Sequence, residues 1–445
     1  MTDQTPDSND RGGARATPPG IVAILVLAVL TEALVALLLA SRDRHPPRST
    51  AAPPLARPTT PCHGVQVTPG DDIQSLINAN PARTTFCFAS GTYQLSGTVW
   101  TADRYPILDL RAGAVIDGQD GGFIGINGSD APVGQSGTTI LGGVFEHFGN
   151  ASAPIWANPL IVRRNMVIEG TEFTENFNSG LAIQGSNARV TDVFTHHNGR
   201  YGLVVTPPCV GCPGPVGIVI EESEIAFNNT RQLPTNDDAG GTKFVYSDGM
   251  IVRANHVHDN YGSGLWWDAG NRNARVYDNV ISNNRNWGIL WELSYGGAKF
   301  YGNTLTGNGA GAGTPSSFTA VQLLISASDG TIGGIEIYQN TIDGTAYPLV
   351  LLNHNSHPTR TRNVYVHDNV MTFRASTTRV GAYAANGLVE LFSPEANNRF
   401  DHNTYRVPNM SGAYWAWDGK VSLTWIQWRG YGQDGNGSLE LVPTV

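Results

Sequence analysis

Two acidic residues, one sequence repeat apart, carry the strongest chemical signal in this chain. Asp268 ends the segment GLWWD, and Glu292 ends the segment GILWE 24 residues later. Both segments alternate with a period of two, which indicates β-strands. If Leu265 and Trp267 point inward, Asp268 points outward, and Glu292 follows the same pattern. Strands from successive repeats that stack side by side would bring the two acidic residues to about 4.8 Å from each other.

Two carboxylates this close disfavour each other's charge unless a cation or a shared proton intervenes. Lys243, one of only three lysines in the chain, aligns within one residue of this row, one repeat earlier. The same stretch supplies an aromatic ring and two further polar side chains. The predicted catalytic residues are Lys243, Asp268 and Glu292, and the predicted substrate-binding residues are Trp266, Asn271 and Arg272.

Two kinds of reaction could use these residues. In β-elimination or C5-epimerisation of a uronate, Lys243 would remove the C5 proton and Arg272 would bind the carboxylate. Asp268, Glu292 and Asn271 would hold Ca²⁺, which prefers oxygen ligands and is the only cofactor we expect. In glycoside hydrolysis, Asp268 and Glu292 would act as acid and base. Adjacent repeats are compatible with the carboxyl separations of both retaining and inverting enzymes.

A non-catalytic interpretation stands beside these reactions. The two acidic residues could form salt bridges with Lys243, Arg272 or Lys299 on a solvated face, in a glycan-binding protein or an envelope scaffold. An enzyme is expected to have a groove on the Asp268 face, walled by the loops at 207–216 and 230–242, whereas a scaffold is expected to be smooth there.

The histidines form a weaker signal. His256 and His258 alternate along one strand near Asp259, which could give a metal or acid–base site, and His196 and His197 are a similar pair. The register places them on a different face from Asp268, and we expect them to be structural.

The elements that position these residues follow from a repeat. Asn255, Asn279 and Asn303 are spaced by 24 residues, and each precedes a short strand-like segment. This period is too short for helical-pair repeats and suits one coil of a stacked β-structure. The apolar slot two residues after each asparagine extends in both directions, with longer intervals where loops are inserted. The slot is filled by Phe173, Phe194, Ile225, Val257, Ile281, Leu305, Ile342, Met371 and Tyr405.

With these repeats, residues 62–405 resemble the right-handed parallel β-helix superfamily, which includes pectate lyases. The resemblance implies an all-β, single-stranded right-handed parallel β-helix with an N-terminal capping helix, preceded by one transmembrane helix. It also implies a polysaccharide as the partner. The superfamily contains lyases, hydrolases, epimerases and adhesins, so the repeats predict the architecture and leave the reaction open. Stacked asparagines are expected to form a structural ladder.

The segments outside the repeats predict five parts in all: a cytoplasmic tail (1–20), a transmembrane anchor (21–40), a Pro-rich stalk (41–61), the β-helix (62–408) and an aromatic-rich cap (409–445). The anchor is about 20 residues of mainly Ile, Val, Leu and Ala, long enough to span a bilayer. A cleaved signal peptide is the alternative. Asp71–Pro81 predicts a short capping helix, and a second short helix is expected near Leu423–Arg429.

Cysteines and composition limit the remaining choices. Cys62 and Cys87 flank the capping helix, and Cys209 and Cys212 form a CxxC pair, so two disulfides and an extracytoplasmic β-helix are expected. The net charge of −9 argues against a nucleic-acid partner. With 40% hydrophobic residues the chain can bury one elongated core, so we expect one main domain and a monomer held at the cell membrane by its N-terminal helix.

Overall fold

The computed structural model describes residues 61–235, 238–309, 320–344, 347–353, 360–384 and 387–442. The predicted cytoplasmic tail, the predicted transmembrane segment and nearly all of the predicted stalk lie outside these residues. Within the described ranges, none of the helices is both long and apolar enough to span a bilayer.

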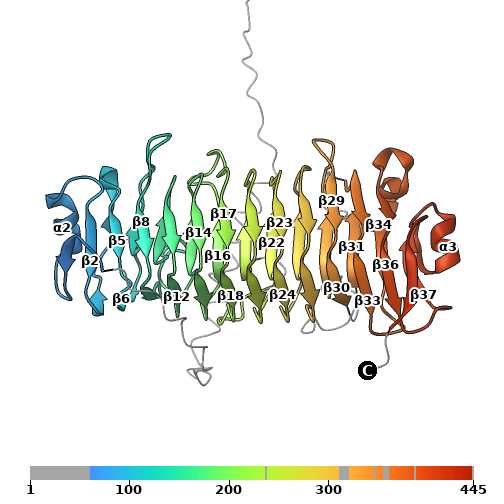
Figure 1. Ribbon diagram of the computed structural model, residues 1–445, viewed down its shortest axis with the longest axis horizontal. Coiled ribbons are helices and arrows are strands. Elements are labelled where there is room, and N and C mark those ends of the chain that lie inside the picture. The colour runs from blue at the N-terminus through green and yellow to red at the C-terminus, as the bar shows by residue number, and fades with distance from the viewer. Residues whose placement is uncertain are drawn as a thin grey trace, which may run out of the picture. The chain divides into compact units, whose positions relative to one another are not determined.

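The strands form a parallel β-helix, as the repeats predict. In the described residues there are three 13-stranded sheets, here called sheets A, B and C, and successive strands of one sheet come from successive coils. Figure 1 shows the strands stacked side by side between helix α2 at the blue end and helix α3 at the red end. Neighbouring strands are parallel, apart from the terminal pair β37–β38, which is antiparallel.

The strands of each sheet, in chain order, are the following. Sheet A contains β1 (Val65–Val67), β2 (Thr85–Phe88), β5 (Ile107–Asp109), β8 (Thr139–Leu141), β11 (Val167–Glu169), β14 (Arg189–Thr191), β17 (Val219–Glu221), β20 (Ile251–Arg253), β23 (Arg275–Tyr277), β26 (Lys299–Tyr301), β29 (Ile335–Tyr338), β32 (Val364–His367) and β35 (Arg399–Asp401). Sheet B contains β3 (Gly91–Gln94), β6 (Ala114–Gly121), β9 (Val144–Phe148), β12 (Glu172–Thr174), β15 (Phe194–His196), β18 (Glu224–Ala226), β21 (His256–His258), β24 (Val280–Ser282), β27 (Thr304–Thr306), β30 (Thr341–Gly344), β33 (Val370–Phe373), β36 (Thr404–Val407) and β39 (Ser438–Leu441). Sheet C contains β4 (Val99–Trp100), β7 (Ile126–Asn127), β10 (Leu160–Val162), β13 (Leu181–Ile183), β16 (Tyr201–Val205), β19 (Gly240–Phe244), β22 (Leu265–Asp268), β25 (Ile289–Glu292), β28 (Val321–Ser326), β31 (Tyr347–Asn353), β34 (Val380–Ala384), β37 (Ala413–Trp417) and β38 (Lys420–Thr424). The helices are α2 (Ile73–Ala79), η1 (Ala102–Arg104), η4 (Val389–Phe392), η5 (Pro394–Ala396) and α3 (Trp425–Gly430).

The core is a column of inward side chains inside the coils. In the three-residue strands of sheet A the middle residue points inward, and Val252, Val276 and Phe300 are all fully buried. The predicted slot in sheet B is a similar column with one correction: Thr195, not Phe194, stands in register with Phe173. The slot accepts this polar residue because the Thr195 hydroxyl donates to the carbonyl of Gly202 at 2.7 Å.

The repeat asparagines form the expected ladder. The backbone N–H of Asn255 donates to Oδ1 of Asn279 at 3.0 Å, and Asn279 makes the same bond to Asn303 at 3.1 Å. A second ladder in another corner links Asn260 to Asn284 and Asn284 to Asn308. These buried amides satisfy backbone groups that the turns leave unpaired, so their role is structural.

Both ends of the coil stack are closed. Asp72 caps α2 by accepting the backbone N–H of Ser75, as its position before the helix predicts. At the other end Thr424 and Gln427 form a capping box for α3, and Trp415 and Trp428 are fully buried. The terminal aromatic residues therefore close the core. Strand β39 pairs with β36, which carries sheet B past the predicted limit at 408.

Both predicted disulfides are present, Cys62–Cys87 and Cys209–Cys212. They support an extracytoplasmic location, because disulfides persist in oxidising compartments.

Candidate functional site

Strands β22 and β25 bring the two predicted acidic residues together. Asp268 lies directly opposite Glu292 in the parallel pair, in the register that the 24-residue spacing predicts. Leu265 and Trp267 are fully buried in the core. By alternation along the strand, Asp268 therefore points out of sheet C, and Glu292 points out beside it.

Lys243 supplies the cation of this group. Its Nζ lies 3.0 Å from Oδ2 of Asp268, and the two side chains are only 15% and 22% exposed. Phe244 pairs with Trp267, so Lys243 lies directly beside Trp266. Lys243 therefore stands two residues before the row of Asp268 and Glu292, where we predicted at most one, and its side chain reaches Asp268 diagonally. The partial burial of this ion pair makes its attraction stronger than that of an exposed surface pair.

Trp266 is not an open platform for a sugar. It is only 2% exposed, and the ammonium of Lys243 lies 4.0 Å from the centroid of its ring. The ring belongs to a second apolar cluster, separate from the main core, whose other buried members are Trp287, Leu290, Val321, Leu324, Val350 and Leu352. The buried ring of Trp266 therefore packs against the Nζ of Lys243 and holds it in place.

The other two predicted substrate-binding residues lie in the corner that follows β22. Asn271 is fully buried, accepts the backbone N–H of Ser247 at 2.9 Å and donates to the carbonyl of Phe244 at 3.1 Å. Arg272 lies beyond the corner, where its Nε is 3.1 Å from Oδ2 of Asp248. Asn271 thus serves the fold, and Arg272 is half exposed beside the site.

The predicted Ca²⁺ site does not fit these donors. Oδ1 of Asn271 is bound to Ser247, and Asp268 is paired with Lys243. Among the residues that the structure describes, no three His, Cys, Asp or Glu side chains lie close enough to hold a metal ion. We therefore derive no step through Ca²⁺.

A loop borders the site where the strands of sheet C begin. The Tyr201 hydroxyl donates to Oδ1 of Asp238 at 3.0 Å, and Arg200 forms an ion pair with the same carboxylate. Burial and the Asp238 charge raise the pKa of Tyr201 well above its ordinary value. Earlier in the same loop, Oγ1 of Thr235 accepts a hydrogen bond from Nδ2 of Asn286 at 2.8 Å. The described part of the predicted 230–242 wall is thus fixed to both earlier and later coils.

An exposed aromatic residue borders the site where the strands end. Tyr246 follows β19, is 45% exposed and donates its backbone N–H to the carbonyl of Ala269, the neighbour of Asp268. The sequence prediction missed it, because Tyr246 lies after the strand and outside the alternating pattern. The sequence did contain a signal, because the two corners differ in length. Asp268 is followed by the three residues AGN up to the corner, whereas Glu292 is followed by only two, LS.

The histidines lie on sheet B, a different face from the acidic pair, as predicted. Nε2 of His196 is 3.0 Å from Oε1 of Glu172, and Nε2 of His258 is 3.0 Å from Oε1 of Glu224. Imidazole–carboxylate pairs of this kind hold neighbouring coils together, so they are not part of the candidate site.

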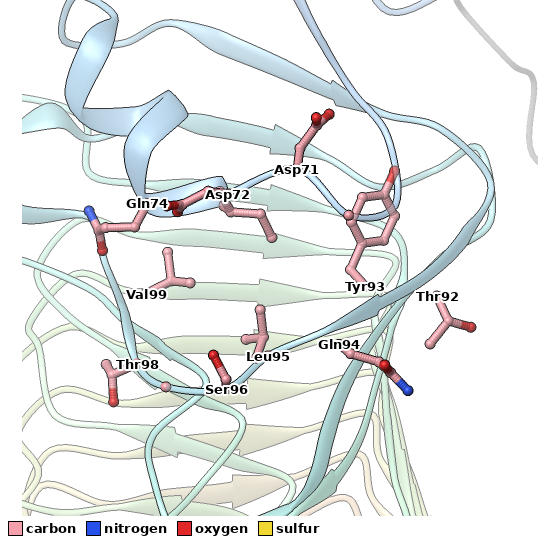
Figure 2. A pocket seen from close by; sticks show the side chains of 13 residues that line it. Asp71, Asp72, Gln74, Thr92, Tyr93, Gln94, Leu95, Ser96, Thr98 and Val99 are labelled. Carbon is pink, nitrogen blue, oxygen red and sulfur yellow. The ribbon is translucent and has the colours of Figure 1, made fainter.

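A concave region of about 510 Å³ lies far from this chemistry, at the capped end of the coil stack. Figure 2 shows Asp71 and Asp72 at its rim, beside Tyr93 and Leu95. Asp71 accepts from the hydroxyl of Thr68, and Asp72 caps α2. The polar groups of this region are occupied in closing the end of the fold.

Comparisons with known proteins agree with the fold. A family model described as a right handed beta helix region matches residues 159–324, which include the acidic pair and Lys243. No curated protein matches the chain. The complex of XylC with xylose is similar over 83% of this chain and 82% of that chain, with 12% identity and a TM-score of 0.55.

Two further solved structures have lower TM-scores. The A-module of the Azotobacter vinelandii mannuronan C-5 epimerase AlgE6 is 16% identical over 84% of this chain and 95% of that chain, with a TM-score of 0.43. PfbA, a surface adhesin of Streptococcus pneumoniae, is 11% identical over 74% of this chain and 85% of that chain, also with a TM-score of 0.43. The family model and the likeness to XylC support a right-handed parallel β-helix fold, which hosts carbohydrate-active enzymes and adhesins alike.

Proposed function

We propose that this β-helix protein hydrolyses glycosidic bonds of a polysaccharide, with Asp268 and Glu292 as the reacting carboxyl groups. The observation that carries the proposal is their direct pairing on adjacent strands, with the Nζ of Lys243 at 3.0 Å from Asp268. Nothing in the fold requires two carboxyl groups side by side on an outward face, and their repulsion costs stability unless the pair has a function.

The arrangement gives the two carboxyl groups different roles. Asp268, which forms the ion pair with Lys243, is assigned as the nucleophile, and Glu292 is assigned as the acid. Adjacent strands place the Cα atoms of the two residues about 4.8 Å apart, which lets their carboxyl groups adopt the separation of about 5–5.5 Å that retaining enzymes use. Glu292 protonates the leaving oxygen while Asp268 forms an ester with the sugar. Water, deprotonated by Glu292, then releases the sugar and restores both groups.

The same contacts argue against the uronate reaction. A lysine that removes a proton needs its Nζ free to reach the substrate, but Nζ of Lys243 lies 3.0 Å from Oδ2 of Asp268 and 4.0 Å from the centroid of the Trp266 ring. For the reaction assisted by Ca²⁺, the oxygen of Asn271, one of the three predicted donors, is already bonded to Ser247. Binding without turnover is the second candidate, because the ion pair alone is compatible with it.

The test uses residues 59–445, a compact unit by itself, incubated with neutral and uronic oligosaccharides, with and without Ca²⁺. Hydrolysis releases reducing ends, whereas elimination gives the ultraviolet absorbance of unsaturated uronates. We expect reducing ends alone and a loss of about 100-fold or more in Glu292→Gln and Asp268→Asn. We expect Lys243→Met to lose at least about tenfold.

The matched controls are Glu336→Gln and Lys299→Met, because these two residues form an ion pair of similar length, 2.9 Å, on sheet A. Their activity should equal that of the parent protein. Absorbance without excess reducing ends would replace hydrolysis by elimination. Glycan binding without either product would place the protein among the non-catalytic binders.

A further inference from the structure

The corner that follows sheet C has the same backbone conformation in successive coils. Tyr246, Ala269, Leu293 and Ala327 all adopt the left-handed region, with φ between 47° and 56°. Alanine fills this position in two of the four coils, so the fold does not require an aromatic residue there. The position also accepts a bulky residue, since Leu293 occupies it in one of the four coils.

The next coil contains an extra residue beneath the tyrosine ring. The corner ladder runs from Ser247 to Asn271 and from Asn271 to Ser294. One residue separates Glu292 from the ladder, whereas Ala269 and Gly270 both separate Asp268 from it. A Cβ atom on Gly270 would overlap the ring of Tyr246. Because Gly270 has no side chain, the ring of Tyr246 packs directly on its backbone.

A loop supports the tyrosine from the preceding coil. A Cβ atom on Gly214 would overlap the carbonyl oxygen of Tyr246, so the backbones are in close contact. Gly214 lies two residues after Cys212, which forms a disulfide with Cys209. The tyrosine is therefore fixed between the disulfide loop and Gly270, and its ring needs little further ordering to bind a ligand.

The ring remains open to solvent next to the acidic pair. Tyr246 is 45% exposed, in contrast to the 2% of Trp266. A second exposed aromatic residue, Tyr295 (43%), donates its backbone N–H to the carbonyl of Asn271 at 2.7 Å. Tyr246 thus lies one coil before Asp268, whereas Tyr295 lies in the coil of Glu292, beyond the corner residue Ser294.

We propose that Tyr246 on Gly270 forms a sugar-binding subsite for a neutral pyranose ring adjacent to the bond that is cleaved. The apolar C–H face of a pyranose packs on an aromatic ring, and the exposed ring of Tyr246 offers such a surface. A neutral sugar is favoured because the nearby carboxylates and the net charge of −9 repel a polyanion. This inference rests on the proposed hydrolysis and names the substrate class of the same site.

Steady-state kinetics on neutral oligosaccharides of increasing length test the subsite. We expect Tyr246→Ala to raise KM about threefold to tenfold, with kcat within about twofold, because a stacking contact made equally in substrate and transition state is lost. Tyr246→Phe keeps the ring and should stay within about twofold of the parent protein in KM. Trp100→Ala is the matched control, since Trp100 is 54% exposed on β4 at the far end of sheet C.

Binding measurements separate this inference from the proposed reaction. Calorimetric titration of Glu292→Gln with the same oligosaccharides should show binding that is about threefold to tenfold weaker when Tyr246→Ala is added. Turnover with unchanged KM and binding in Tyr246→Ala would overturn the subsite and leave hydrolysis standing. Tyrosine-dependent binding without turnover in the parent protein would retain the subsite and overturn hydrolysis. Tighter tyrosine-dependent binding of uronate chains than of neutral ones would overturn the substrate class.

Discussion

At the scale of single residues, the outward side chains of sheet C have two kinds of role: some could react, and others hold the reacting groups in place. Lys243 contacts both a carboxylate and an indole ring, and the indole is buried. The sequence predicted that these residues would meet, because their types and the repeat length are local information. It could not show that Trp266 is covered or that Asn271 turns into the corner. Strict alternation assumes a solvated outer face, whereas a second apolar cluster lies outside this sheet.

The histidines of sheet B make a pH-dependent contribution to stability. Burial alone lowers the pKa of His258, but hydrogen bonds to Glu224 and Asp259 outweigh it and raise the pKa above its ordinary value. A hydrogen bond from His258 lowers the pKa of Glu224. The stabilisation by His258 is therefore complete below its unfolded pKa of about 6.5 and is lost as the pH rises through its raised folded value.

We accordingly expect His258→Gln to lower the melting temperature more at about pH 6 than at about pH 9. The difference should correspond to less than about 1 kcal/mol, because solvent screens this partly exposed pair. Burial and the charge of His258 lower the pKa of the neighbouring His256. Removing His258 relieves part of that lowering, which favours the variant at low pH and makes the difference between the two pH values smaller. Thermal melts of both proteins across this pH range measure the effect, and an equal loss at both pH values would contradict it.

At the scale of elements, the 24-residue spacing predicted the coils well because every coil must bury the same column of side chains. The spacing did not predict corners whose length changes by one residue. Gly270 is such a change: a single insertion after Asp268 moves Asn271 into the ladder and leaves space for the ring of Tyr246. An insertion of this kind alters no strand pattern, so only the stacked backbone shows its consequence.

The asparagine ladder provides a test at this scale. Asn279→Ala would leave the buried backbone N–H of Asn255 without its acceptor and remove the second hydrogen bond to the carbonyl of Val252. An orphaned group costs about 1–3 kcal/mol, so the midpoint of urea unfolding should fall clearly. Asn279→Asp keeps the acceptor but puts a carboxyl oxygen against the carbonyl of Val252 and Oδ1 of Asn303, so its midpoint should fall at least as far. Asn273→Ala, at an exposed corner, should lose less than Asn279→Ala, because water can replace its hydrogen bond to Asp248.

At the scale of the whole molecule, each coil contacts mainly its neighbours, so stability is a sum of local terms along one axis. Strand β39 and the aromatic residues around α3 close one end, and α2 with the Cys62–Cys87 disulfide closes the other. Activity at the central coils should therefore be insensitive to damage at either end. The sequence predicted both closures because capping residues and cysteine positions are visible without the fold.

Removing the terminal disulfide tests this one-dimensional behaviour. The bridge joins residues 25 positions apart, and loop-closure entropy gives it about 3 kcal/mol. In Cys62→Ser/Cys87→Ser we expect faster hydrogen exchange in β1, α2 and β2, because the end coil can open without the rest. Exchange in β22 and β25, and turnover at Asp268, should match the parent protein.

The control Cys209→Ser/Cys212→Ser frees the loop that supports Tyr246 and should instead weaken sugar binding while leaving exchange at the capped end unchanged. Faster exchange along the entire stack in the first variant would mean that the coils unfold as one cooperative unit, and the end would then no longer be independent of the site.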